Sequence, residues 1–117
     1  MKIIKKSDTT PFANSETCYG VEFPFESQAL NIAIITIDGR YPAKGRLVNE
    51  VCQEIAYVMS GSGKIGFDGH EQDLQAGDAI FLDANEPYYW QGNKMQLFVP
   101  CSPAFYPEQH KEINTES

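Results

Sequence analysis

Two carboxyl groups and a thiol recur at every second position of one short segment. Glu50, Cys52 and Glu54 lie within 46–59, where two strand-like runs flank Cys52. Alternate residues of a strand share a face, so these three side chains can point to one side. Inside a barrel, burial would raise the pKa of each carboxyl, and mutual repulsion would raise one further. A carboxyl group with a raised pKa can act as a general acid or base near neutral pH.

The register of this segment leaves two alternatives open. A shift of one residue turns the whole set to the other face, which would bring Asn49 inward and leave Glu50 in solvent. The sequence does not decide between Asn49 and Glu50. Glu54 also has a purely structural interpretation, as a carboxyl hydrogen-bonded to tyrosines or water in a polar interior.

Three consecutive rings, Tyr88, Tyr89 and Trp90, are the feature most typical of a ligand site. In a strand, Tyr88 and Trp90 face the same way and Tyr89 the other. Such rings combine a large apolar face with a polar group, which suits stacking on a ring-bearing ligand or a sugar. The alternative is that two of the three pack in the core or at a dimer contact.

Basic residues are few, but Arg40, Lys44 and Arg46 lie within one stretch of seven positions. They can receive a carboxylate or phosphate, which would make the ligand anionic. The alternative, a solvated loop with salt bridges, is the commoner role of such a run.

Metal chemistry has little support in the residue types. Imidazole is the usual ligand for transition metals, but His70 is expected at the surface beside a turn and His110 lies in the tail. A mixed site of Glu50, Glu54, Cys52 and a returning His110, or an oxygen-rich Mg or Mn site, stays conceivable. The three cysteines form no Cys-x-x-Cys pair, and Cys52 and Cys101 are expected to be buried packing residues.

Composition excludes several classes of protein. The chain has 117 residues with 42% hydrophobic residues, which is typical of one globular domain. The formal net charge of −7 argues against nucleic-acid binding. No targeting signal or run of about 20 apolar residues is present, and the odd cysteine count does not suggest a disulfide framework. We therefore expect a cytoplasmic protein without a membrane partner.

The elements that must position these residues are short strands separated by turns. Strands are expected at 19–25, at 30–37 as a run buried on both faces and ended by Asp38-Gly39, in 46–59, at 64–67, 70–74, 79–82, 88–91 and 95–99. Turns are expected at 60–63, at Asp68-Gly69 as a type I′ hairpin, at 75–77 and at Gly92-Asn93. Loops are expected at 41–45 and 83–87, and any helix in the tail is short. Eight or nine strands joined by hairpins predict an all-β sandwich or closed barrel.

The spacing of two of these segments is similar to that of the cupin superfamily. Residues 54–61 resemble the second half of cupin motif 1, and 77–82 resemble the start of motif 2, with Pro87 where many cupins carry a proline. The resemblance covers about 30–100. It implies a cupin-type double-stranded β-helix, or jelly-roll barrel, as a single domain over 1–117 with a short N-terminal strand arm and a C-terminal tail.

The departures from the family pattern bear on function. Of the three histidines and one glutamate that usually hold the metal, only Glu54 remains. The histidine positions fall, depending on the register, on Val48 and Glu50 or on Leu47 and Asn49, and for motif 2 on Tyr88. The resemblance therefore implies a small bacterial cupin with degenerate metal-binding motifs, and we expect no metal or other cofactor.

These observations support three hypotheses. The first is a non-catalytic module that binds a small ring-bearing or anionic molecule. The second is a metal-independent isomerase or epimerase of a sugar or similar metabolite, with Glu50 or Glu54 as base and Tyr88 as acid. The third is a dioxygenase-like metalloenzyme with unusual ligands.

Six residues and two segments are predicted to form the ligand site and the dimer contact. The predicted ligand-binding residues are Arg46, Asn49, Glu50, Glu54, Tyr88 and Trp90. We also expect a homodimer that uses 19–25 and 30–37, because exposed edges and apolar faces need cover.

Overall fold

Nine strands account for most of the chain in a computed structural model, which describes residues 1–113. The strands are β1 Thr10–Ser15, β2 Cys18–Glu22, β3 Asn31–Tyr41, β4 Arg46–Asn49, β5 Gln53–Phe67, β6 His70–Gln75, β7 Ala79–Leu82, β8 Tyr89–Ser102 and β9 His110–Ile113. Two single-turn 3-10 helices, η1 (Lys6–Asp8) and η2 (Pro107–Gln109), complete the described elements. The expected all-β class is confirmed. No helix within the described residues is long and apolar enough to span a membrane.

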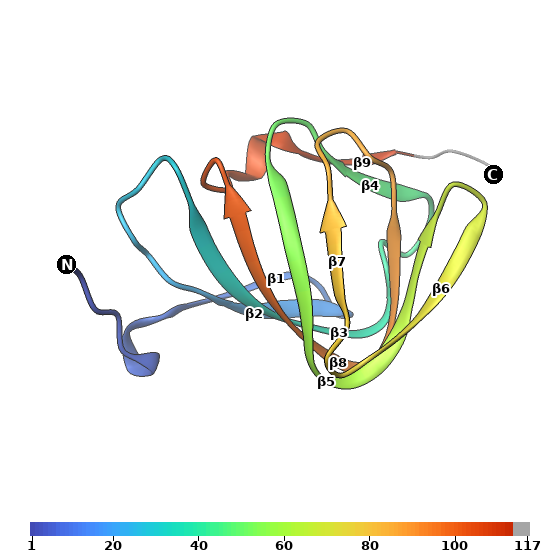
Figure 1. Ribbon diagram of the computed structural model, residues 1–117, viewed down its shortest axis with the longest axis horizontal. Helices are drawn as coiled ribbons and strands as arrows, with labels where there is room; N and C mark the ends of the chain where they lie inside the picture. Colours follow the sequence, from blue (N-terminus) through green and yellow to red (C-terminus); the bar gives the residue numbers. More distant parts are fainter. Residues whose placement is uncertain (114–117) are drawn as a thin grey trace.

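All strands pair antiparallel. The main sheet has the order β1-β2-β3-β8-β5-β6, with β7 pairing on β5, and β4 pairs with β9 in a small second sheet. An isolated bridge between Leu47 and Tyr88 connects the small sheet to the start of β8. Figure 1 shows the main sheet curling round a central space, with β4 and β9 lying across its upper side.

The core lies inside this curl. Its largest fully buried members, Ile37, Leu47, Val58, Met95 and Leu97, come from four different strands. On β5 the buried Ala56 and Val58 alternate with the exposed Ile55, Tyr57 and Met59. This period of two places every second residue of β5 inside, which is the physical basis for an inward Glu54.

Several local expectations are confirmed. Asp68 and Gly69 have φ of 47° and 76°, as a type I′ hairpin requires, and join β5 to β6. The turn at 75–77, the strand at 79–82 and the loop at 83–87 are also present. The tail carries only the short η2 before β9.

Three predicted breaks between strands are wrong. β3 continues through Asp38-Gly39 to Tyr41, β5 runs unbroken through 60–63, and β8 is continuous across Gly92-Asn93. Register shifts at these places show that they are β-bulges. A glycine in a bulge bends a strand without ending it, so the same residue that signals a turn is used here to curve a long strand.

Two further expectations need correction. β2 ends at Glu22, before Pro24, so the strand predicted for 19–25 is shorter. The run 30–37 is not buried on both faces. Its residues up to Thr36 are exposed or half-buried, because the inward side chains Ile35 and Ile37 line a cavity while Ile34 lies on the outer face of the sheet.

Candidate functional site

A cavity lies inside the curled sheet, with an accessible volume of about 90 Å³. Space of this size holds several waters or one small ring. Its wall is mainly apolar and aromatic, and polar side chains are contributed by β1 to β5 and by β9. The inner wall includes Cys18, Ile37, Tyr41, Asn49, Glu54, Ala56, Leu82, Tyr88, Trp90, Leu97, Cys101 and His110. Apolar cavities with a few convergent polar groups are the usual form of a small-molecule site.

Glu54 is the carboxyl group inside this wall. It stands on β5 between Leu82 of β7 and Cys101 of β8, which are its direct partners in the two neighbouring strands. Burial raises the pKa of Glu54 to about 7, although a hydrogen bond from Asn49 opposes that rise. The group is therefore divided between its acid and base forms near neutral pH.

A directed chain of hydrogen bonds runs to Glu54 from the tail of the protein. Asn49 Nδ2 donates to Glu54 Oε1 over 2.7 Å, which leaves Asn49 Oδ1 to accept from His110 Nδ1 over 2.8 Å. His110 Nε2 then accepts from the Tyr41 hydroxyl over 3.0 Å. Burial lowers the pKa of His110 and raises that of Tyr41, so both are neutral at pH 7, as this order of donors needs. Because Oε1 accepts from Asn49, a proton on Glu54 is held at Oε2.

β9 brings His110 into the site. Asn49 and His110 are paired residues of β4 and β9, so their side chains meet across the ladder. His110 also packs between Tyr41, with ring centroids 6.2 Å apart, and Phe105, at 5.8 Å. We predicted His110 only as a possible metal ligand in the tail, and the sequence carries no local signal for this pairing.

Gln109 is a second residue that sequence analysis missed. Its side chain is 2% exposed, and Oε1 accepts hydrogen bonds from the backbone N–H groups of Val51 and Cys52, at 3.1 and 2.7 Å. This contact fastens the loop between β4 and β5 to the tail. It thereby helps hold Asn49 and Glu54, which flank that loop, in register.

Tyr88 and Trp90 share the inner side as predicted. Both are buried and line the cavity, with ring centroids 5.7 Å apart in an edge-to-face arrangement. Burial, followed by the nearby Glu54 carboxylate, raises the pKa of Tyr88 well above its usual value, so its hydroxyl stays protonated. Tyr89 faces outward and donates a hydrogen bond to Glu71.

Glu50 and Arg46 do not line the cavity. Glu50 is exposed, whereas Asn49 lines the cavity together with Glu54, because the loop 50–52 between β4 and β5 interrupts the alternation on which both alternatives rested. Arg46 is buried with its guanidinium 5.3 Å from the centre of the outward Tyr89 ring. Arg40 lies over the same ring at 4.1 Å and donates to the carbonyls of Pro42 and Gly45. Arg40 therefore braces the segment before β4.

The donor set does not fit the metal that most cupins hold. Within residues 1–113, the one group of three potential ligands is Cys52, Glu54 and Cys101, whose donor atoms lie within 4.8 Å of one another. Two thiols and a carboxyl differ from an imidazole-rich set. The hydrogen bond with Cys52, burial and the Glu54 carboxylate also raise the pKa of Cys101, which opposes formation of a thiolate ligand. His70 is exposed, and Glu50 takes no part in this group.

Comparison with known proteins identifies the family of the chain and several solved structures of similar fold. Residues 35–97 match the family model described as cupin domain. No curated protein matches the chain.

Four solved structures illustrate the fold. Pac13, described as a nucleoside dehydratase, has 15% identity and a TM-score of 0.84 over 100% of this chain and 94% of its own. A variant of this Streptomyces protein with uridine has 17% identity and a TM-score of 0.83 over 100% of this chain and 95% of its own. Ectoine synthase from P. lautus has 16% identity and a TM-score of 0.73 over 99% of this chain and 93% of its own. An RmlC-like cupin from Shewanella frigidimarina has 19% identity and a TM-score of 0.70 over 89% of this chain and 92% of its own. At such identities the likeness shows the jelly-roll fold alone.

Proposed function

The chain belongs to the cupin family, and from the chemistry of its cavity we propose that it is a metal-independent acid–base enzyme acting on a small ring-bearing metabolite. The observation that carries the proposal is Glu54, a largely buried carboxyl with a pKa near 7 in an aromatic-lined cavity. A base poised near the working pH has the right protonation state and enough driving force for proton transfer.

The chemistry of such a site begins with removal of a proton from carbon. Glu54 Oε2 takes a proton from a carbon next to a carbonyl, and the electron pair moves to the carbonyl oxygen. The protonated Tyr88 hydroxyl lines the same cavity and supports that developing charge as a hydrogen-bond donor. Return of the proton to another carbon completes an isomerisation. Alternatively, the proton held on Glu54 passes to a β-hydroxyl, whose C–O bond breaks as the enolate electron pair forms a C=C bond, and water leaves. This elimination is the type of reaction named for the nucleoside dehydratase with the same fold.

Asn49 and His110 are positioning residues in this scheme. Asn49 holds Oε1 through its amide, and His110 fixes the orientation of that amide. The free oxygen of Glu54 is thereby directed away from Asn49, which orients the base for a bound molecule. Trp90 and Tyr88 supply the ring faces on which such a molecule packs.

The test is exchange of carbon-bound hydrogen in heavy water. A panel of small carbonyl and nucleoside compounds is incubated with the protein, and loss of proton signals is followed by NMR. We expect exchange for at least one compound, with a rate that rises through about pH 7 as Glu54 ionises. Glu54→Gln should abolish it.

Glu50→Gln is the matched control, because Glu50 is an exposed carboxyl four positions away that does not line the cavity. It should leave the exchange unchanged. Binding of a panel compound without exchange would contradict the enzymatic proposal and support the non-catalytic binding module instead.

The metalloenzyme hypothesis has its own measurement. From the donor set we expect purified protein to hold no stoichiometric Mn, Fe, Ni or Zn by elemental analysis. A stoichiometric metal that disappears in Cys52→Ser but not in Cys18→Ser would contradict this expectation. Cys18 is a suitable control because it is also a buried free cysteine.

A further inference from the structure

The charge of the cavity wall restricts what can enter it. Among the described residues, none of those lining the cavity is Lys or Arg. The acidic side chains there are Glu54 in the interior and Glu22 at the end of β2, where the side chain is exposed. The remaining ionisable groups are neutral at pH 7. Burial lowers the pKa of His110 and raises those of Tyr41, Tyr88 and Cys18, and a hydrogen bond with Cys52 together with burial raises that of Cys101.

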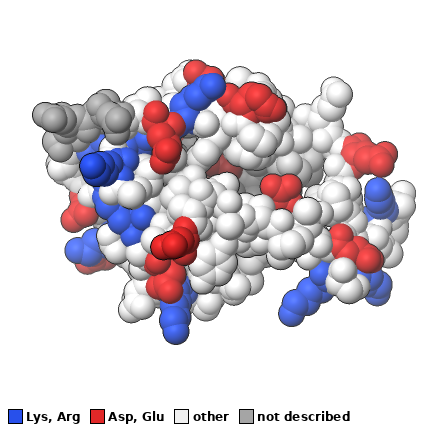
Figure 2. Space-filling model, turned by 180° about the vertical axis from the view of Figure 1, so that it is seen from behind, with Lys and Arg blue, Asp and Glu red and all other residues white. Residues whose placement is uncertain are grey.

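The basic side chains nearest in the chain are engaged elsewhere. Arg40 donates to the Pro42 and Gly45 carbonyls and lies over the outer Tyr89 ring, where Arg46 also lies. Lys44 is exposed in the loop before β4. In Figure 2 the Lys and Arg side chains on the visible face lie mostly toward its outline, whereas Asp and Glu side chains also occur nearer its middle.

An anion that enters such a cavity loses water without gaining a countercharge. Burial of an unpaired carboxylate or phosphate is among the most costly events in a protein interior. The carboxylates of the wall add repulsion. A neutral molecule has neither an unpaired charge to bury nor a repulsion to overcome, and a cation is attracted by the carboxylates.

We propose that this cavity admits neutral or cationic ring compounds and excludes their phosphorylated or carboxylated counterparts, with Glu22 as a specificity-determining residue at the entrance. The substrate class is then an unphosphorylated, uncarboxylated ring-bearing metabolite. This inference rests on the proposed function, since it describes the ligand of the same site. It differs from the anionic ligand that the basic run suggests in the sequence.

Three probes with the same ring and different charge test the proposal. Benzyl alcohol, benzylamine and benzoate are titrated into the full-length protein at pH 8, and resonances of cavity residues are followed by NMR. We expect the dissociation constants of benzyl alcohol and benzylamine to be at least about tenfold lower than that of benzoate. Benzoate binding as tightly as benzyl alcohol would overturn the inference and leave the cavity as a ligand site.

Reversal of the charge of Glu22 should improve the binding of benzoate. Glu22→Arg should narrow the gap between benzoate and benzyl alcohol, because it supplies the missing countercharge. Glu16→Arg makes the same change of net charge at an exposed position that does not line the cavity, and it should keep the gap. An equal effect of both variants would mean that net charge alone sets the preference. If none of the three probes shifts the cavity resonances, the proposed small-molecule site itself fails.

Discussion

At the scale of single residues, Glu54 is the carboxyl group that the described strands place deep in the cavity wall, and its pKa is unusual. Glu54 lies in a wall of mostly apolar side chains, where its carboxylate accepts a hydrogen bond from Asn49. A charged carboxyl in that position is stabilised less than in water, which is why its pKa rises.

Glu54→Gln should stabilise the protein at alkaline pH. The pKa of Glu54 is raised from 4.5 to about 7 on folding, so the folded state binds this proton more tightly than the unfolded chain. Its stabilising contribution is complete below pH 4.5 and is lost as the pH rises through about 7. Since Gln retains an acceptor for Asn49, we expect about 3 kcal/mol greater stability for the variant at pH 8. Urea unfolding at pH 8 and pH 4 measures it, and an equal difference at both values would refute the assignment.

His110→Phe should change the titration of Glu54 without removing the ring. A phenyl group can still pack against Tyr41 and Phe105, but it has no N–H for Asn49 Oδ1. The Asn49 amide is then free to rotate away from Glu54, and the hydrogen bond that lowers the pKa of Glu54 weakens. We expect a higher Glu54 pKa in carbon-13 NMR titration. An unchanged value would show that Asn49 keeps its orientation without His110.

At the scale of elements, the barrel depends on two glycines that lie at or beside the β-bulges of its two longest strands. Gly61 of β5 has φ +75°, and a Cβ there would lie 2.2 Å from the Lys94 carbonyl oxygen of β8. Gly92 of β8 similarly has no room for a Cβ, which would lie 2.2 Å from the Ile37 oxygen of β3. These close approaches let β5 and β8 curve together around the cavity.

Gly61→Ala should destabilise the protein far more than Gly69→Ala. Both glycines have positive φ, at 75° and 76°, but a Cβ at Gly69 would meet no atom within 4 Å. The two variants therefore share the backbone strain and differ in the clash with Lys94. We expect the Gly61 variant to lose at least about 2 kcal/mol more in denaturant unfolding. Equal losses would mean that the strands shift to absorb the methyl group.

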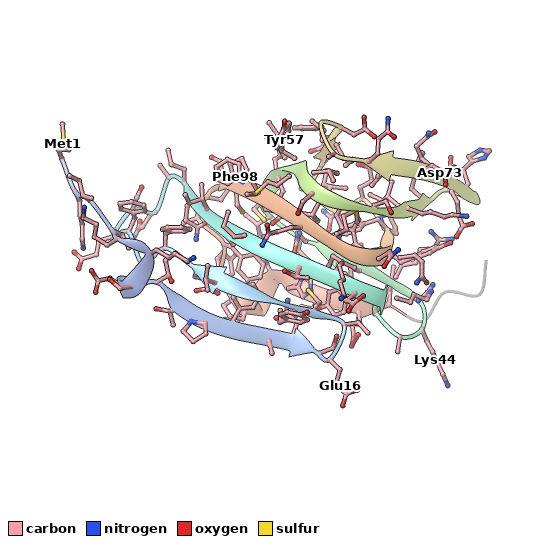
Figure 3. All side chains as sticks on the ribbon, turned by 90° about the horizontal axis from the view of Figure 1, so that it is seen from below. Met1, Glu16, Lys44, Tyr57, Asp73 and Phe98 are labelled. Atoms are coloured by element: carbon pink, nitrogen blue, oxygen red, sulfur yellow. The ribbon has the colours of Figure 1, made fainter. Side chains whose placement is uncertain are left out.

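At the scale of the whole molecule, the outer face of the main sheet is unusually apolar. Tyr57 of β5 pairs with Phe98 of β8, Phe98 with Ile34 of β3, and Ile34 with Val21 of β2, so one apolar row crosses four strands. Figure 3 shows this face, with Tyr57 and Phe98 labelled near each other. Phe81 of β7, which is 57% exposed, pairs with Ile55 of β5, two residues before Tyr57.

The homodimer expected from the sequence stays a prediction, and this face is where we expect the contact. It includes Val21 and Ile34 from the two segments proposed for dimerisation and adds β5, β7 and β8. An extended sheet face can meet its own copy about a two-fold axis. Phe81→Lys should convert the dimer to monomer in analytical ultracentrifugation. Phe67→Lys, an exposed ring at the far end of β5, should not, and a monomeric wild type would contradict the prediction.

That residues 1–117 form a single cupin domain also stays a prediction, as do the cytoplasmic location and the absence of a cofactor. The described strands support the first of these in one respect. β1 and β9, from opposite ends of the described chain, both belong to the sheets around the cavity, because Phe12 and His110 line it.

The sequence by itself determined the features that depend on neighbouring residues. Alternation identified most strands, Asp68-Gly69 identified its hairpin, and the parity of Tyr88 and Trp90 placed both rings on one face. Only the tertiary structure decided that Asn49 faces inward, that Gly61 and Gly92 bend strands instead of ending them, and that His110 returns to the site. The physical reason is that turns and periodicity arise from local sterics. Register, bulges and distant strand pairing are instead set by contacts between residues far apart in the chain, which no local pattern encodes.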